Sequence, residues 1–277
     1  MYFDLKKPEL SPEEKALSIA TYYDLPFHYL DPVRLQILEA GPIDPAAVTP
    51  PDHLTDLIRL EGYVPGSDYG YCMLDDGAGF VATYNVFHNA TMDMLKWWFP
   101  WMNTKAANQP SGVGNIKYKV WCPYGHFDHG MAVDSDGNMV PRAAEALDLT
   151  LDGDPVDNIY MHGLDPLEFG LSHERKAELD AAGVIYGISY ETFDYPGMHL
   201  CMNMMRPCPT GGIEAFGREW MGYGIRNGKI VRVPETPVNE AFLKKVVLHC
   251  SLEMQHLDEI LPLLYAEYKD RPADAAL

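Results

Sequence analysis

The fold is decided by residues 236–268, TPVNEAFLKKVVLHCSLEMQHLDEILPLLYAEY. This stretch predicts one long amphipathic helix, with Thr236 as N-cap and Pro237 at the first helical position, where a missing N–H costs nothing. The residues on one face of that helix follow one another at spacings of three or four. Its members are Phe242, Val246, His249, Glu253, Leu257, Ile260 and Leu264.

His249 and Glu253 therefore fall inside the apolar stripe. A carboxylate on a buried face is costly unless something pairs with it. A histidine one turn away on the same face indicates that this partner is a metal ion. Two other interpretations stay open at this point: a buried His–Glu hydrogen bond, or a helix rotated so that both side chains face water.

The composition bounds the class of protein. The chain has 277 residues, of which 47% are apolar, and this is enough for a folded core. Its formal charge of −19 argues against nucleic acid or an anionic membrane as a partner. No apolar run reaches membrane-spanning length, and residues 1–15 lack the apolar centre of a signal peptide, so we expect a cytoplasmic protein. The five cysteines share no CxxC spacing and are expected to be reduced.

Residues 1–75 are rich in proline and short helical patterns, and we expect a small, mostly helical N-terminal domain there. Ser11 and Glu14 form a capping-box pattern for a helix that would run to about Tyr23. Trp97, Trp98 and Trp101 lie in a later aromatic cluster that is more typical of a core than of a ligand box.

Residues 76–277 read as antiparallel strands followed by the long helix. Asp76-Gly77 and Asn227-Gly228 are hairpin signals, Asp134 to Asn138 is a turn, and Ser172 caps a short helix. Strands are expected at about 117–133 (in two pieces), 142–160 (a pair that turns around Gly153), 184–190, 198–206, 213–225 and 229–233. A single sheet can bury one long helix only by curling around it. We therefore predict an α+β helix-grip domain whose interior is the ligand site.

The helix alone cannot complete a metal site, so ligands must come from the sheet. The best candidates are His126 and His129 in GHFDHG and Asp157 in PVDNIY. Weaker candidates are His162, Asp165 and Glu168. Histidine and carboxylate ligands without thiolates are typical of catalytic zinc, which lowers the pKa of water and polarises carbonyls. Tyr118 precedes His126 by an even number of residues and would share its face if the strand continued.

Three motifs, KYKVW leading to a histidine, WMGYGIRNGKIVRVP and HCSLEMQHLDEILPLLYAEY, together resemble the diacetylphloroglucinol/phloretin hydrolase family. Their order and spacing extend over roughly 160 residues. The resemblance implies a Bet v 1-like (helix-grip) C-terminal domain, a smaller helical N-terminal domain and a homodimer. It also implies a zinc hydrolase that cleaves the carbon–carbon bond between an acyl group and a phenolic ring.

The resemblance also implies roles for individual residues. His126, His249 and Glu253 match three metal ligands, and Asp157 stands where the family carries a fourth, a glutamate. Tyr118 matches a tyrosine important for activity. Departures from the family pattern lie around these residues. His129 replaces an asparagine, and the position of a catalytic histidine falls on Asn203 or His199.

Three functions follow as hypotheses. The first is a zinc-dependent carbon–carbon hydrolase acting on an acylated polyphenol or related diketone. The second is a non-hydrolytic metalloenzyme on the same scaffold, an isomerase, cyclase or decarboxylase of a phenolic or polyketide substrate. The third is a helix-grip protein that binds an apolar ligand without catalysis. His/carboxylate sites also accept other divalent metals, so the metal itself stays open.

Overall fold

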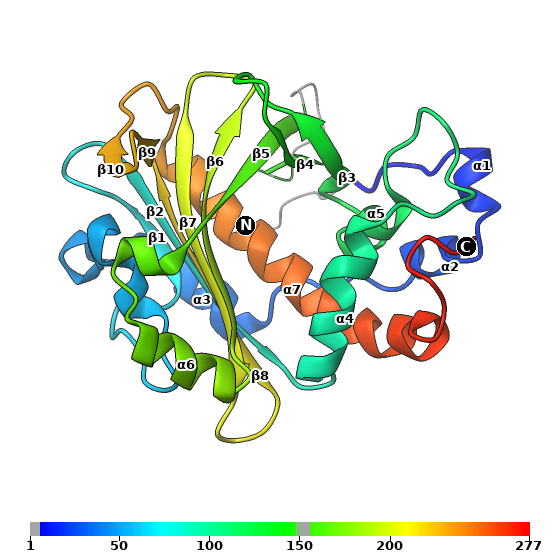
Figure 1. The fold of residues 1–277 in the computed structure, drawn as a ribbon, viewed down its shortest axis with the longest axis horizontal. Helices are drawn as coiled ribbons and strands as arrows, with labels where there is room; N and C mark the ends of the chain where they lie inside the picture. Colours follow the sequence, from blue (N-terminus) through cyan, green and yellow to red (C-terminus); the bar gives the residue numbers. More distant parts are fainter. Residues whose placement is uncertain (1–5, 148, 150–155) are drawn as a thin grey trace.

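A computed structural model describes residues 6–147, 149 and 156–277. Eight antiparallel strands form one sheet in the order β1-β2-β8-β7-β6-β5-β4-β3, and a long helix crosses it (Figure 1). The fold is therefore α+β with a large antiparallel sheet and a C-terminal helix. The strands of the sheet are β1 (Gly70–Met73), β2 (Gly79–Phe87), β3 (His126–Val133), β4 (Met139–Glu145), β5 (Asp157–Leu164), β6 (Ile185–Phe193), β7 (Met198–Pro207) and β8 (Ile213–Met221).

The long helix is α7 (Glu240–Tyr268). The predicted start at Thr236 was wrong, because Asn239 is the N-cap and accepts a hydrogen bond from the N–H of Phe242 at 3.0 Å. Thr236 instead accepts from the N–H of Met198 at 3.0 Å, which ties the segment before α7 to β7. The predicted buried face is confirmed. Val246, His249, Glu253, Leu257, Ile260 and Leu264 are all buried, whereas Phe242, the first member of the face, is only partly buried.

The N-terminal region is helical in short pieces. These are α1 (Pro12–Lys15), α2 (Ala20–Tyr23), α3 (Pro32–Glu39) and 3₁₀ helices η1 (Pro45–Ala47) and η2 (Pro51–Leu57). The capping box of Ser11 and Glu14 is confirmed, but its helix ends at Lys15 and a separate one begins at Ala20. A division at residue 75 falls in the turn between β1 and β2, which pair with each other. The two-domain division stays a prediction.

Two further helices lie beside α7, α4 (Met92–Asn103) and α5 (Ile116–Trp121). The strand expected from residue 117 was wrong in its first part. Asn115 accepts from the N–H of Lys117 at 3.1 Å and so caps a helix there. Trp98 and Trp101 on α4 are 0% and 2% exposed, which confirms them as core residues.

The opposite face of the sheet has its own apolar core, to which η2, η3 (Pro166–Phe169) and α6 (His173–Ala181) belong. Ser172 caps α6 as predicted. The strand expected over 213–225 is interrupted at Gly222. It divides into β8 and β9 (Tyr223–Arg226), and β9 pairs with β10 (Lys229–Arg232) across Asn227-Gly228. Both turn residues have positive φ, 52° and 71°, as this hairpin type requires.

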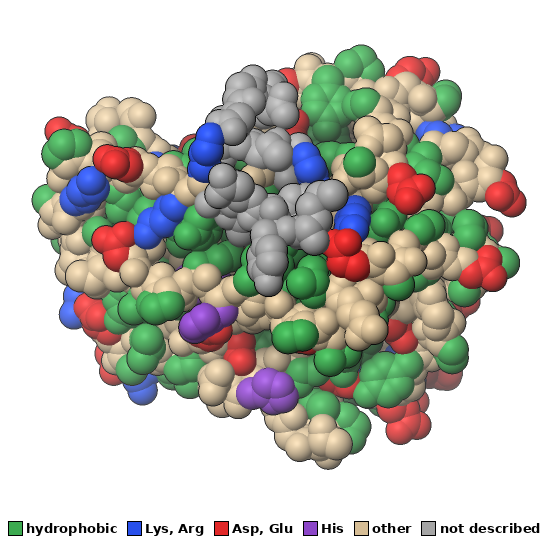
Figure 2. All heavy atoms as spheres, turned by 180° about the vertical axis from the view of Figure 1, so that it is seen from behind, with side chains coloured by type: hydrophobic (Ala, Val, Ile, Leu, Met, Phe, Trp, Pro, Cys, Tyr) green, Lys and Arg blue, Asp and Glu red, His purple; other side chains and the backbone are tan. Residues whose placement is uncertain are grey.

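The remaining expectations concern the pair of strands at 142–160, the cysteines and the surface. β4 and β5 pair as expected, whereas the predicted turn at Gly153 lies outside the described residues. All five cysteines are free. No helix in the described part of the chain combines the length and apolarity needed to cross a membrane. On the face in Figure 2, the Lys and Arg side chains that are described lie scattered among acidic and apolar ones.

Candidate metal centre

A β-bulge brings the two histidines of GHFDHG to the same face of the sheet. His126 pairs with Glu145 and His129 with Ala143, so three steps along β3 match two along β4. The extra residue is Phe127, at the register shift between His126 and Asp128. In a regular strand, residues three apart would point to opposite faces. The bulge packs closely, because a Cβ on Gly114 would lie only 1.7 Å from the carbonyl oxygen of Phe127.

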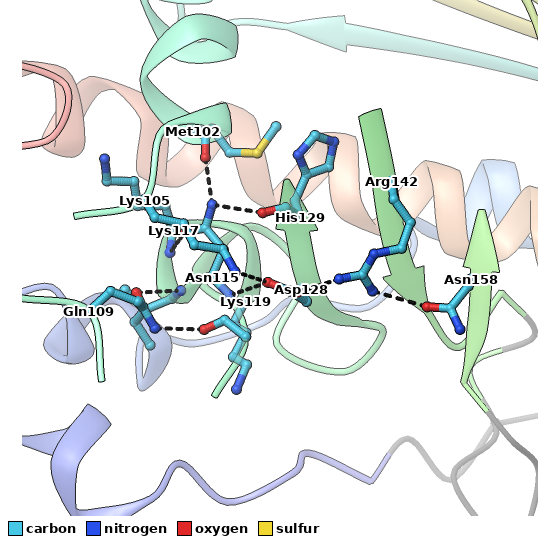
Figure 3. A network of polar contacts seen from close by, with 12 residues as sticks. Met102, Lys105, Gln109, Asn115, Lys117, Lys119, Asp128, His129, Arg142 and Asn158 are labelled. Atoms are coloured by element: carbon cyan, nitrogen blue, oxygen red, sulfur yellow. Dashed lines mark hydrogen bonds and ion pairs between the residues drawn. The ribbon is translucent and has the colours of Figure 1, made fainter. Parts of the chain in front are cut away.

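Polar contacts hold this part of β3 against α5 (Figure 3). The amide of Asn115 donates to the carbonyl oxygen of Met102 at 2.8 Å, and its backbone N–H donates to Asp128 at 2.8 Å. Lys105 and Arg142 also pair with Asp128. The ring of His129 points away from Asp128 in Figure 3. This network leaves both histidine rings on the side of the sheet that α7 covers.

On that side, His126 contacts Glu253 and His249 of α7. Its Nε2 lies 3.0 Å from Oε2 of Glu253 and 3.3 Å from Nε2 of His249. Nε2 of His249 lies 3.9 Å from the same oxygen of Glu253. The two histidine side chains are 0% and 2% exposed. His249 and Glu253 of α7 and His126 of the bulged strand therefore converge at one buried site.

Glu145 completes the group, and sequence reasoning missed it. Its two carboxylate oxygens lie 3.9 Å from Nε2 of His126 and 3.9 Å from Nε2 of His249. Asp157, expected as the fourth ligand, is the cross-strand neighbour of Glu145 and lies one strand farther from His126. The available signal was a lone carboxylate in the run AAEAL, but only the strand register shows that it faces inward.

The hydrogen bonds of the two histidines leave their inward nitrogens as acceptors. Nδ1 of His126 lies 3.3 Å from the carbonyl oxygen of Tyr118, and Nδ1 of His249 lies 3.2 Å from that of Leu147. A carbonyl accepts only from N–H, so each Nδ1 carries the proton and each Nε2 presents a lone pair. Two such lone pairs 3.3 Å apart, beside two carboxylates, form a donor set that can hold a metal ion.

The closest contact, between the two histidine nitrogens, has the spacing of a tetrahedral metal site. Bonds of about 2.0–2.1 Å in a tetrahedral site place neighbouring ligand atoms about 3.3 Å apart. Carbonyl acceptors on the outer nitrogens are the usual support of metal-binding histidines. A second buried grouping includes Cys122, whose Sγ lies with the ligand nitrogens of His126 and His249 inside 4.8 Å. A buried Cys122/His126/His249 group can therefore also bind a metal.

Electrostatics point the same way. Burial lowers the pKa of His126 and of His249 to about 4, so both rings are neutral at pH 7. Burial raises the pKa of Glu253 to about 7 and that of Glu145 above its usual value. In the absence of a cation, the ligand set thus holds too much negative charge for its surroundings. A divalent ion would reverse that imbalance.

Tyr118 lies against this centre from α5 rather than from a strand. Its hydroxyl donates to Oε1 of Glu145. Burial and the nearby carboxylates raise its pKa well above 10, so the phenol keeps its proton at neutral pH. His129 lies next to it, with ring centroids 5.0 Å apart, and burial lowers its pKa to about 4. Nδ1 of His129 has no hydrogen-bond partner among the described residues.

Other candidates from the sequence lie elsewhere. His199 and Asn203 lie on the same face of β7, the face that points towards the interior at His199. His199 is buried, whereas Asn203 is exposed. His162 stacks on Tyr190, pointing to the opposite face from its neighbour Met161, so the weaker expectation that it supplies a ligand was wrong. Asp165 is the N-cap of η3, where it accepts from the N–H of Leu167.

The fold and this centre define a class of protein, an α+β domain with a buried His/carboxylate group between sheet and helix. The model of the DAPG hydrolase PhiG domain matches residues 52–266. The chain therefore belongs to the DAPG (diacetylphloroglucinol) hydrolase family, as the sequence motifs predicted. It is also 28% identical over 269 residues to phloretin hydrolase of Eubacterium ramulus, with 93% of each chain covered.

Proposed function

We propose that the protein is a zinc-dependent hydrolase that cleaves the carbon–carbon bond between an acyl group and a phenolic ring. The observation that carries the proposal is the convergence of Nε2 of His126 and His249 with the carboxylates of Glu145 and Glu253. Membership of the DAPG hydrolase family and similarity to a phloretin hydrolase support the substrate class, a phenolic ketone. Glu145 takes the fourth ligand position in this proposal, and Asp157 is the alternative.

The overall reaction consumes one water. Its hydroxyl joins the acyl carbon to form a carboxylic acid, while a proton joins the ring carbon as the carbon–carbon bond breaks. A bound zinc ion supplies Lewis acidity and lowers the pKa of water. The side chains supply positioning and proton transfer, for which a residue must lie within hydrogen-bond reach of the reacting group.

Tyr118 is the first candidate for proton transfer. Its hydroxyl is held by Glu145 and remains protonated, so it can donate a hydrogen bond or a proton at the centre. His129 is the second candidate. It is neutral at pH 7 and buried, and its Nδ1 is unpaired among the residues described, so it can accept a proton from the substrate or from water. His199 and Asn203 stay candidates for substrate contact from β7.

Three further expectations, on the domain type, the location and the oligomeric state, complete the proposal. The sheet and α7 form a helix-grip (Bet v 1-like) domain, with the helical N-terminal region as a small separate unit. The protein acts in the cytoplasm, in keeping with its free cysteines. It forms a homodimer, as the family resemblance implies. Size-exclusion chromatography with light scattering tests the homodimer.

The decisive experiment measures metal and reaction together. Purified protein should contain close to one zinc per chain by mass spectrometry, and His249→Ala should contain only traces. In H₂¹⁸O, an acylphloroglucinol should yield its deacylated ring and a carboxylic acid carrying one ¹⁸O atom. An isomerised product of unchanged mass would instead favour the non-hydrolytic metalloenzyme. No metal in the native protein, with ligand binding intact in His249→Ala, would favour the non-catalytic binding protein.

A further inference from the structure

Three polar side chains outside the metal centre share the interior face of β6, β7 and β8. His199 pairs with Glu191 on one side and with Met221 on the other, and Met221 belongs to the core against α7. Glu219 lies two residues before Met221 on β8 and so points to the same side. Glu191, His199 and Glu219 therefore face α7, as Glu145 does.

Among the described residues, Glu191 and Glu219 have only thiol partners, Cys201 for Glu191 and Cys250 for Glu219, and His199 has an unpaired ring nitrogen. Nε2 of His199, a residue 1% exposed, has no hydrogen bond. Its Nδ1 lies 4.0 Å from Oε2 of Glu191, too far for a hydrogen bond. The closest polar contact of Glu219 is the thiol of Cys250, with Sγ 3.9 Å from Oε1. A buried polar group left without partners normally indicates a ligand, an ion or water.

The charge of this cluster restricts what that ligand is. Burial, with a smaller contribution from the charges of Glu145 and Glu253, raises the pKa of Glu219 to about 7. Burial and Glu219 raise the pKa of Glu191 well above its usual value. Carboxyl groups whose pKa is raised by burial can act as O–H donors as well as acceptors. An anionic ligand would be repelled, whereas neutral hydroxyl groups match both capacities.

A second metal ion fits this place less well. A metal would draw three or four ligand atoms together, as at the centre on α7. Here Nδ1 of His199 lies 4.0 Å from Glu191, whereas at the centre on α7 Nε2 of His126 lies 3.0 Å from Glu253 and 3.3 Å from His249. The side chain of Glu191 is 19% exposed, so the cluster is in contact with solvent at this residue. The ring of Phe193 lies 4.5 Å from that of His199 and adds an aromatic wall.

We propose that Glu191, His199 and Glu219 form a subsite that binds the ring hydroxyl groups of an uncharged, polyhydroxylated aromatic ketone. The subsite lies on the sheet, and the metal centre lies between the sheet and α7, so one molecule can place its ring at the former and its acyl group near the latter. This inference rests on the proposed function, and it names what selects the substrate. A site built to pair buried polar groups rejects analogues that lack the matching hydroxyl.

The test compares Glu219→Leu and Glu191→Leu with Glu219→Gln in the metal-loaded protein. Titration calorimetry measures the dissociation constants of a 2,4,6-trihydroxyphenyl ketone and of its 4-hydroxyphenyl analogue with the same acyl chain. We expect the leucine variants to bind the trihydroxy ketone at least 10-fold more weakly and the monohydroxy analogue within 2-fold of wild type. Glu219→Gln, which keeps a hydrogen-bonding amide, should recover part of the loss.

Thr192→Val is the matched control, because Thr192 follows Glu191 but contacts His162 on the other face. Circular dichroism and metal content check that each variant is folded and loaded. The subsite is overturned if the leucine variants bind both ketones equally more weakly, or if they bind both as tightly as wild type. If the variants lose the preference for the trihydroxy ketone and the wild-type protein releases no carboxylic acid, the subsite is supported and the hydrolase is rejected. If the wild-type protein releases carboxylic acid and the variants keep the preference for the trihydroxy ketone, the hydrolase is supported and the subsite is rejected.

Discussion

The phenol ring of Tyr118 lies flat against the imidazole of His126, with centroids 4.0 Å apart and 4° between the planes. The same tyrosine uses its carbonyl oxygen to fix Nδ1 of His126 and its hydroxyl to contact Glu145. One residue thus orients a nitrogen ligand and touches a carboxylate ligand at once. Because the ring and the hydroxyl do different things, substitution can separate them.

Tyr118→Phe should keep the metal and lose the reaction. The ring still stacks on His126, and the backbone carbonyl is unchanged, so we expect metal content equal to wild type. Loss of the hydroxyl removes a proton donor, and activity should fall by about 10²–10⁴-fold. Steady-state kinetics with metal analysis checks this. Tyr160→Phe, on the outer face, is the control. A fully active Tyr118→Phe enzyme would remove this tyrosine from the mechanism.

Glu145→Gln and Asp157→Asn decide between the two proposed fourth ligands. Glu145 lies 3.9 Å from both histidine nitrogens, so its amide variant should bind zinc at least 10-fold more weakly. Asp157→Asn should retain close to wild-type affinity in a competition titration with a chelator. The reverse pattern would return the ligand to Asp157.

Gly125→Ala should disturb the centre through packing alone. An added Cβ would lie 3.0 Å from Cε1 of His249 and 3.0 Å from Cδ2 of Leu149. His249 is held by a carbonyl and cannot retreat easily, so we expect about 1–3 kcal/mol of destabilisation. We also expect weaker metal binding. Denaturant unfolding of the metal-free and metal-loaded forms measures both effects. Gly163→Ala, where the new Cβ meets open space, should change neither.

His256→Leu should make the protein less sensitive to acid. Both ring nitrogens of His256 lack partners among the described residues, and burial lowers its pKa to about 4. The unfolded chain, with the usual pKa near 6.5, then binds more protons than the folded one, so stability falls as pH drops from 6.5 towards 4. Between pH 7.5 and 5 this amounts to about 2 kcal/mol.

Urea unfolding at both pH values tests that expectation. The difference between pH 7.5 and pH 5 should shrink by about 2 kcal/mol in His256→Leu. The exposed His53→Leu should leave it unchanged. An unaltered difference in His256→Leu would show that His256 is not protonated on unfolding.

Local signals were sufficient for much of the fold. The spacing of apolar residues predicted α7 and its buried face, and Asn227-Gly228 predicted a hairpin, because both patterns act over a few residues. KYKVW alternates as a strand does, but the cap at Asn115 makes it helical. Spacing and family motifs predicted a shared site for His126, His249 and Glu253, and the structure brings these three side chains together. Glu145 was missed because its position opposite His126 depends on strand register between separate segments.

The bulge at Phe127 also bears on how this chain should be compared with its relatives. A chain lacking that one residue would still pair His126 with Glu145 and His129 with Ala143, but through a regular ladder. A single-residue deletion here would therefore keep both pairings while removing the bend that the bulge introduces. An alignment that places its gap elsewhere in GHFDHG would assign the second histidine to the wrong partner.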